Sequence, residues 1–205
     1  MPLINQEVYE TRIWGLWKIE ESEETLRQLT SEIGPQEINH PEKRLEHLAV
    51  RALIKKILLS WGVTFEGLTK NEHGKPFLKN LNLHVSLSHS FPYVTAIVDT
   101  EKTVGIDLEH SRAKLLKIAP RMLHAAEQTD AGLDVAKLCV YWCAKEALLK
   151  VYGKKDLIFV KNLRVEPFIL KEKGNLIGRI IVNTTETAVP LHYRLFGDFA
   201  IVYNQ

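Results

Sequence analysis

The chain has 205 residues, of which 45% are hydrophobic and 25% are charged. This composition is typical of a globular protein and excludes a disordered or fibrous one, and the length allows either one large domain or two small ones. The net charge of +2 argues against nucleic acid as a partner, because nucleic-acid-binding domains usually carry a strong basic excess.

The sequence predicts neither a membrane segment nor an export signal. Residues 1–7 lack a charged start followed by an apolar core, and no apolar run approaches the roughly 18 residues that span a bilayer. The two cysteines, Cys139 and Cys143, have a spacing that suits neither a zinc site nor a redox pair. We therefore expect a cytoplasmic monomer with two buried thiols.

Strand and helix patterns follow one another in the first hundred residues. Residues 11–19 are rich in β-branched and aromatic side chains and predict a strand, and a short helix is expected at 22–32. A longer helix is predicted at 41–60, with Pro41 in its first turn and Gly62 beyond its end. Strands are expected at 64–69, 75–79, 83–87 and 93–99, with a turn at 72–74.

The second half of the chain begins with a predicted strand at 103–109. Helices are expected at 113–127 and 133–152, and strands at 163–170, 176–183, 191–196 and 198–203. Gly174-Asn175 and Gly197-Asp198 predict hairpin turns. Helices combined with antiparallel hairpins predict an α+β fold, with lobes at residues 1–100 and 101–205.

Two acidic residues stand out in the predicted strand at 103–109. Alternate side chains of a strand share a face, so Asp107 and Glu109 project together, opposite the apolar residues of the segment. Paired carboxylates suit Mg²⁺, which takes one or two of them together with substrate phosphates, and Gly105 leaves that face open. The alternative is a half-exposed strand with two solvated acids.

The predicted helix at 133–152 places Glu146 and Lys150 one turn apart. This helix is apolar almost all round, and such helices are usually buried. Buried charges need partners, and a metal ion with phosphate groups would satisfy both side chains. The alternative is an ordinary surface ion pair between them.

Three further segments are candidates for binding an anion. Gly74-Lys75-Pro76 holds a lysine on a turn, where it serves either as a phosphate ligand or only as a solvated side chain. Ser88-His89-Ser90 ends a strand with several hydrogen-bond donors, although a histidine can also be held locally there. One sector of the helix at 41–60 is basic and contains Arg44, His47, Arg51 and Lys55. This sector is either functional or merely a solvated helix face.

In this order the segments resemble the motifs of the 4′-phosphopantetheinyl transferases, of the long single-chain type named for the surfactin enzyme. The matching segments are the basic helix, Gly74-Lys75-Pro76, Ser88-His89-Ser90, Gly105-Ile106-Asp107-Leu108-Glu109 and Trp142-Cys143-Ala144-Lys145-Glu146-Ala147-Leu148-Leu149-Lys150. Residues 34–37 lack the basic side chains that some relatives carry there. The segment that ends at Glu127 matches only loosely, so Glu127 is assigned no role.

The resemblance implies two similar α/β lobes with pseudo-twofold symmetry and coenzyme A bound between them. It implies a holo-[carrier-protein] synthase, which moves 4′-phosphopantetheine from coenzyme A to a serine of an apo acyl or peptidyl carrier protein and releases adenosine 3′,5′-bisphosphate. The carrier would be acidic, and fatty-acid, polyketide, peptide and lysine pathways all remain open as its source.

The resemblance also implies roles for individual residues. Asp107, Glu109 and Glu146 would hold Mg²⁺, and Glu146 would accept the proton of the carrier serine. Lys150 and His89 would neutralise the pyrophosphate of coenzyme A as the bond breaks. The nucleotide end of coenzyme A, with its 3′-phosphate, would be contacted by Arg51, Lys75 and Ser88.

Three other functions are compatible with the same residues. A non-catalytic relative would bind coenzyme A or a carrier protein without transferring anything. An α+β interaction domain would use the charged pairs for structure alone. A Mg²⁺-dependent hydrolase of nucleotide pyrophosphates would need only the acidic trio.

Overall fold

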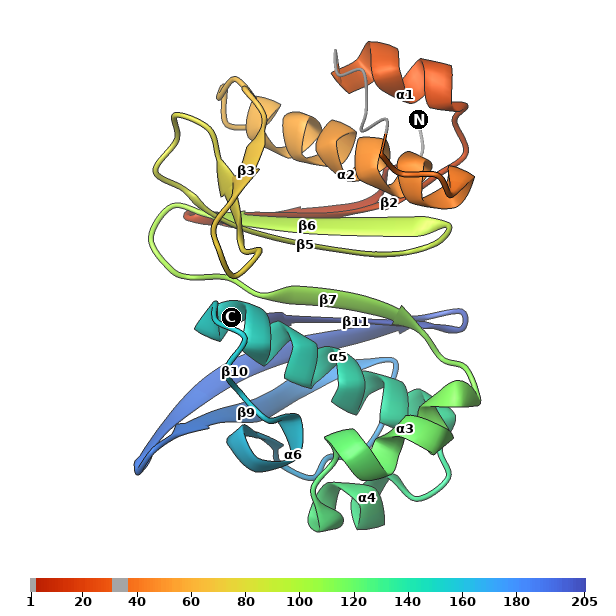
Figure 1. Cartoon of the computed structure of the whole chain (residues 1–205), viewed down its shortest axis with the longest axis vertical. Coiled ribbons are helices and arrows are strands. Elements are labelled where there is room, and N and C mark those ends of the chain that lie inside the picture. Colours follow the sequence, from red (N-terminus) through yellow and green to blue (C-terminus); the bar gives the residue numbers. More distant parts are fainter. Residues whose placement is uncertain (1–2, 31–36) are drawn as a thin grey trace. The chain divides into compact units, whose positions relative to one another are not determined.

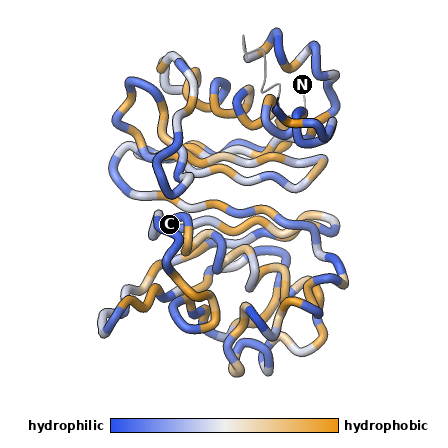
Figure 2. The backbone as a smooth tube through the Cα atoms, in the orientation of Figure 1, coloured by the Kyte–Doolittle hydropathy of each residue, from blue (hydrophilic) through white to orange (hydrophobic). Residues whose placement is uncertain are grey.

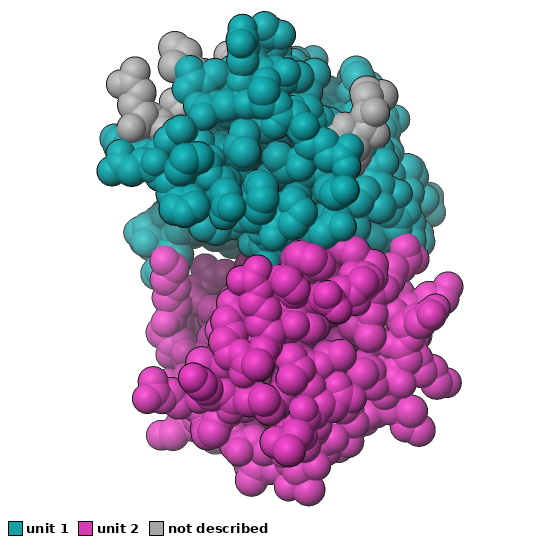
Figure 3. Space-filling model, turned by 90° about the vertical axis from the view of Figure 1, so that its right-hand side faces the viewer, with its two compact units in different colours: residues 1–103 teal, residues 104–205 magenta. Residues whose placement is uncertain are grey.

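The computed structural model describes residues 3–30 and 37–205, which form helices and antiparallel sheets (Figure 1). This mixture confirms the predicted α+β fold class. The chain divides into two compact units, residues 1–103 and residues 104–205 (Figure 3). Nothing in the described ranges is a helix long and apolar enough to cross a membrane.

Unit 1 is built on an antiparallel sheet with the strand order β1-β2-β6-β5. Helix α2 (Pro41–Leu59) covers one face of this sheet and contacts β2, β5 and β6, and α1 (Glu23–Thr30) packs on α2. A separate hairpin joins β3 to β4. The strands of this unit are β1 (Leu3–Val8), β2 (Arg12–Lys18), β3 (Leu68–Lys70), β4 (Pro76–Leu78), β5 (His84–Ser90) and β6 (Tyr93–Asp99).

The core of unit 1 lies between α2 and the sheet. Leu48, Leu53 and Ile57 of α2 are fully buried, as are Val94 and Val98 of β6. Figure 2 shows the hydrophobic residues along α2 and along the strands. The apolar arc of the predicted helix is therefore the face that anchors α2, and its polar side chains are left for other contacts.

Unit 2 has a five-stranded antiparallel sheet with the order β7-β11-β10-β9-β8. Helix α5 (Val135–Tyr152) lies on this sheet and contacts β7 and β11 most extensively. Asp134 caps its start by accepting a hydrogen bond from Lys137 N at 3.0 Å. The other elements are β7 (Ile106–His110), α3 (Lys114–Met122), α4 (Ala125–Ala131), α6 (Phe159–Asn162), β8 (Leu163–Val165), β9 (Lys173–Val182), β10 (Thr185–Phe196) and β11 (Phe199–Asn204).

The predicted hairpin turn at Gly174-Asn175 is wrong, because both residues lie inside β9. The turn between β9 and β10 is formed instead by residues 183–184, where Asn183 has φ +54°, a conformation that asparagine tolerates. Gly174 serves packing rather than a turn, since a Cβ there would stand 2.8 Å from the Tyr193 ring. The predicted turn at Gly197-Asp198 is correct.

Several predicted element boundaries also differ from the structure. Strand β1 was not predicted, and the strand expected at 64–69 begins only at Leu68. The helix expected at 113–127 is two helices: α3 ends at Met122, and His124 caps the start of α4. The strand expected at 163–170 stops at Val165, shortly before Pro167. The end of the predicted helix at 22–32, and residues 34–36 of the segment that lacks the family's basic side chains, lie outside the described residues.

Candidate functional site

Strand β7 and helix α5 form the centre of the candidate site in unit 2. Ile106 and Leu108 are buried on one face of β7, whereas Asp107 and Glu109 lie on the face that α5 covers. Lys150 of α5 donates hydrogen bonds to Asp107 Oδ1 at 2.8 Å and to the backbone oxygen of Ile106 at 2.7 Å. The structure thus brings two of the predicted site residues into an ion pair.

Gly105 explains how β7 comes so close to α5. A Cβ at this position would stand 2.1 Å from the backbone oxygen of Ala147, a distance that no real contact allows. The Gly105 amide is also fixed, because it donates to Asn204 Oδ1 at 2.8 Å. The expectation that Gly105 leaves the acidic face open is therefore wrong: the glycine permits the backbones of β7 and α5 to pack against each other.

Glu146 faces the same cluster from α5. Burial and the negative charges of Asp107 and Glu109 raise the pKa of its carboxyl group, Lys150 partly opposes them, and the resulting pKa is about 7. Burial and charge, rather than a hydrogen bond, cause this change. At neutral pH the Glu146 side chain is therefore divided between its protonated and ionised forms, as suits a general base.

These carboxylates have the donor chemistry that Mg²⁺ prefers, since all their ligand atoms are hard oxygens. Within residues 3–30 and 37–205, however, no three acidic, histidine or cysteine side chains are arranged as a ready cage for a metal ion. Mg²⁺ usually binds through one or two carboxylates and completes its shell with water and substrate phosphates. The residues fit the ion in chemistry, and ligation by all three remains a prediction.

The two cysteines of α5 are buried and free, as expected. Cys139 Sγ donates to the backbone oxygen of Glu109 at 3.4 Å, and Cys143 Sγ donates to that of Ala200 at 3.6 Å. Burial raises the pKa of the Cys143 thiol well above its ordinary value, and the nearby Cys139 thiol and acids add to this effect. Cys143 is therefore a protonated thiol that packs α5 on the sheet, and it is not a metal ligand.

In unit 1, the predicted residues His89 and Arg51 lie near the polar side of α2. His89 Nδ1 stands 3.1 Å from Glu46 Oε2, and Arg51 Nη1 donates to the backbone oxygen of His47 at 3.0 Å. Burial, together with electrostatic interactions with Arg51, Lys70 and His89, lowers the pKa of His47 to about 4. His47 is thus a neutral ring in a strongly positive region, which favours an anionic ligand.

Ser88 and His89 do not form a single polar cluster. Alternate residues of β5 face opposite sides of the sheet: Ser88 is buried on one side, and His89 meets Glu46 of α2 on the other. Lys75 follows a turn whose backbone is held by Asn71, because Asn71 Oδ1 accepts from Lys75 N at 2.9 Å. Burial lowers the pKa of the Lys75 ammonium.

The basic sector of α2 divides into functional candidates and structural contacts. Arg44 Nε donates to Glu23 Oε2 at 3.0 Å, and Lys55 Nζ donates to the backbone oxygen of Leu29 at 2.9 Å. Both of these side chains tie α2 to α1. In the same sector, Arg51 contacts the backbone of His47, and His47 interacts electrostatically with His89.

A buried ion pair next to Glu146 was not predicted from the sequence. Lys145 is fully buried, and its Nζ stands 2.6 Å from Glu127 Oε2 and 2.8 Å from the backbone oxygen of Met122. Glu127 Oε1 also accepts from Val165 N at 2.8 Å. Glu127, which was assigned no role, therefore joins α4 and β8 to α5. The only signal in the sequence was a lysine within an apolar helix.

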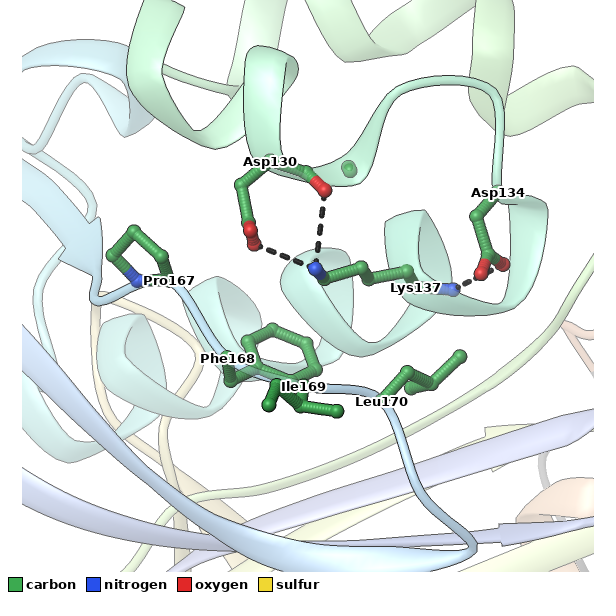
Figure 4. A pocket seen from close by; sticks show the side chains of 8 residues that line it. Asp130, Asp134, Lys137, Pro167, Phe168, Ile169 and Leu170 are labelled. Atoms are coloured by element: carbon green, nitrogen blue, oxygen red, sulfur yellow. Dashed lines mark hydrogen bonds and ion pairs between the residues drawn. The ribbon is translucent and has the colours of Figure 1, made fainter.

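A pocket of about 540 Å³ opens at the other end of α5 (Figure 4). Lys137 Nζ is 2.9 Å from Asp130 Oδ2 and 5.1 Å from the centre of the Phe168 ring. Ile169 and Leu170 add apolar surface. At about 1.5 Å per residue the lysine lies roughly 20 Å along the helix from Lys150, and no predicted site residue lines this pocket.

Comparisons with known proteins find similarity to the family that the sequence motifs resemble. Residues 103–203 match the family model described as "4'-phosphopantetheinyl transferase superfamily". A "4'-phosphopantetheinyl transferase" of Bacillus subtilis is 33% identical over 111 residues, which are 51% of this chain and 48% of the relative. The "4'-phosphopantetheinyl transferase Sfp" of Bacillus subtilis strain 168 is 33% identical over 89 residues, which are 40% of this chain and 39% of the relative.

The chain thus spans about half the length of the first of these relatives and less of the second. The family match covers nearly all of unit 2, including β7, α5 and the four charged residues at their contact. This match places the similarity to the 4′-phosphopantetheinyl transferase superfamily in residues 103–203.

Proposed function

We propose that this protein transfers 4′-phosphopantetheine from coenzyme A to a serine of an apo acyl or peptidyl carrier protein and releases adenosine 3′,5′-bisphosphate. The observation that carries the proposal is the group of Asp107, Glu109, Glu146 and Lys150 at the contact of β7 with α5. All four lie in the segment that matches the superfamily. We further propose the long single-chain subtype named for the surfactin enzyme.

Glu146 is the general base of the proposed reaction. Its pKa of about 7 lets the ionised form accept the proton of the carrier serine, directly or through a water molecule. The serine oxygen then attacks the phosphorus that carries the pantetheine arm. The bond from that phosphorus to the bridging oxygen breaks, and adenosine 3′,5′-bisphosphate leaves.

Charge neutralisation supplies most of the remaining catalysis, as is usual in phosphoryl transfer. Lys150 stands beside Asp107 and can stabilise negative charge that develops on the leaving phosphate, and His89 has the same proposed role. Asp107, Glu109 and Glu146 are the residues that would hold Mg²⁺, which when bound withdraws charge from the pyrophosphate.

Unit 1 supplies the proposed ligands of the nucleotide end of coenzyme A. Arg51 lies in the positive region around His47, and Lys75 stands after a turn that Asn71 fixes. These two cations and Ser88 are proposed to bind the nucleotide and its 3′-phosphate. The acceptor is proposed to be an acidic carrier protein.

The test is to incubate the protein with coenzyme A, Mg²⁺ and apo carrier domains of the acyl and peptidyl type, and to weigh the carrier. A gain of one phosphopantetheine group on the carrier serine is expected. Glu146→Gln should lose transfer, while Glu10→Gln, the same change at an exposed position, should retain it.

Binding of coenzyme A by the same protein separates the alternatives. Tight binding without any transfer to any carrier would replace the proposed enzyme with a binding protein. Cleavage of coenzyme A without a carrier would indicate a hydrolase. Full activity of Glu146→Gln would refute the assignment of the base.

A further inference from the structure

The buried carboxylate of Glu46 contacts the ring of His89. Glu46, on α2, is 1% exposed, and its Oε2 lies 3.1 Å from His89 Nδ1. Its Oε1 accepts a hydrogen bond from Phe91 N at 3.0 Å. Lys43 Nζ lies 2.7 Å from Oε2. Both oxygens of the Glu46 side chain are therefore engaged.

The ionisation of Glu46 determines which nitrogen of His89 carries a proton. Burial raises the pKa of Glu46, but hydrogen bonds from His89 and Lys43 outweigh it and bring the pKa below its ordinary value. An ionised carboxylate only accepts hydrogen bonds, so Nδ1 of His89 must be the donor. Since the side chain of His89 is 40% exposed, its Nε2 is the nitrogen left for an external partner.

We propose that Glu46 is a positioning residue, which holds the His89 ring by Nδ1 and thereby presents Nε2 to a phosphate group of coenzyme A. This inference rests on the proposed function, in which His89 binds phosphate. A carboxylate that holds one nitrogen of a histidine fixes both the orientation of the ring and its tautomer. The protonated ring is the form in which Nε2 donates a hydrogen bond to an oxyanion.

Positive charge surrounds this contact. His47 of α2 interacts electrostatically with His89, and Arg51 and Lys70 add positive charge to the same region. Glu46 is a carboxylate in direct contact with His89 there. Glu46→Gln removes this negative charge and leaves the nearby cations in place.

Glu46→Gln distinguishes positioning from a structural role. The glutamine oxygen can keep the hydrogen bond from Phe91 N, and the fold near the end of β5 should survive. Its amide group then faces His89 Nδ1 and donates to it, so the ring proton must move to Nε2. The substitution thus keeps the hydrogen bond from Phe91 N and moves the ring proton of His89 from Nδ1 to Nε2.

The experiment is ¹⁵N NMR of the histidine rings, combined with the carrier assay. In the wild type, the neutral His89 ring should carry its proton on Nδ1, and in Glu46→Gln on Nε2. Transfer by Glu46→Gln should fall about 10- to 100-fold, the usual effect of removing a partner that orients a functional side chain. Lys43→Gln is the matched control: it removes the lysine ammonium on Oε2 and should keep the proton of His89 on Nδ1.

A double-mutant cycle with His89→Gln completes the test. If Glu46 acts through His89, Glu46→Gln should lower the transfer rate little further in the His89→Gln background. An unchanged tautomer in Glu46→Gln, or equal rate losses in both backgrounds, would overturn the positioning role. If the tautomer reverses but the wild type transfers nothing to any carrier, the proposed function fails while the hold of Glu46 on His89 stands.

Discussion

Replacing Glu146 by glutamine should stabilise the protein at alkaline pH while abolishing its proposed activity. The carboxyl group of Glu146 has a pKa near 7 in the folded protein, against an ordinary value of 4.5. The folded state therefore holds this proton more tightly than the unfolded chain. Since glutamine stays neutral at every pH, the variant does not have to ionise a side chain in this buried position.

The sign and size of the effect follow from linkage. Below about pH 4.5 both states are protonated, so this group adds no pH dependence. As the pH rises towards 7 the unfolded chain loses the proton first, and stability falls. The difference between 4.5 and about 7, at about 1.4 kcal/mol per pKa unit, corresponds to about 3 kcal/mol at pH 8.

Thermal unfolding in a buffer that contains a chelator measures this difference. For a chain of this size, 3 kcal/mol corresponds to a rise in melting temperature of roughly 5 to 10 °C at pH 8, with little difference at pH 4.5. Glu10→Gln, at an exposed position, should show no such change. A Glu146→Gln variant that is equally stable or less stable at pH 8 would refute the reasoning about burial and like charges.

Three further substitutions test the contacts around α5. Gly105→Ala should lower the free energy of unfolding by about 1–3 kcal/mol, because the new methyl group would stand 2.1 Å from the backbone oxygen of Ala147. An unchanged midpoint of urea unfolding would contradict this. Lys145→Met should lower the free energy of unfolding by about 3–5 kcal/mol, because Glu127 would stay buried without its cation. Adding Glu127→Gln should restore much of this stability. A double variant as unstable as Lys145→Met alone would contradict the role of the ion pair. Lys150→Gln should slow transfer about 100-fold in the carrier assay, and an undiminished rate would remove Lys150 from the mechanism.

Elements with strong local signals were predictable from the sequence. The predicted strand at 93–99 coincides with β6, and the predicted helices at 41–60 and 133–152 match α2 and α5 to within two residues. Pro41 and Gly153 mark helix ends, and apolar side chains fill the faces that pack. Strand β1 was missed because its sequence mixes polar and apolar residues at the edge of a sheet.

Glycines misled the predictions where they serve packing. Gly174 was predicted to form a turn, and Gly105 was predicted to leave the acidic face of its strand open. Instead, each glycine lies against a neighbouring group that a side chain would exclude. In the sequence such a glycine looks the same as one in a turn. Only the contact itself, with Tyr193 or with Ala147, separates the two uses.

The candidate site was predictable where its residues share one element. Alternation along β7 was enough to place Asp107 and Glu109 on one face. The pairs Glu46 with His89 and Glu127 with Lys145 were not predictable, because each joins side chains of two different elements. Pairing of that kind depends on how helices pack on strands, and periodicity does not specify it.

Lys145 and Glu146 are charged neighbours in α5, and their surroundings differ in a way that indicates a structural role for one and a functional role for the other. They are neighbours in a helix that is apolar almost all round, so each needs compensation. The protein gives Lys145 a carboxylate and two backbone oxygens as partners. Beside Glu146 it places two more carboxylates, which make ionisation harder. An arrangement that disfavours the charge of its own side chain is explained if a ligand relieves it, and a divalent cation bound with a diphosphate would do so.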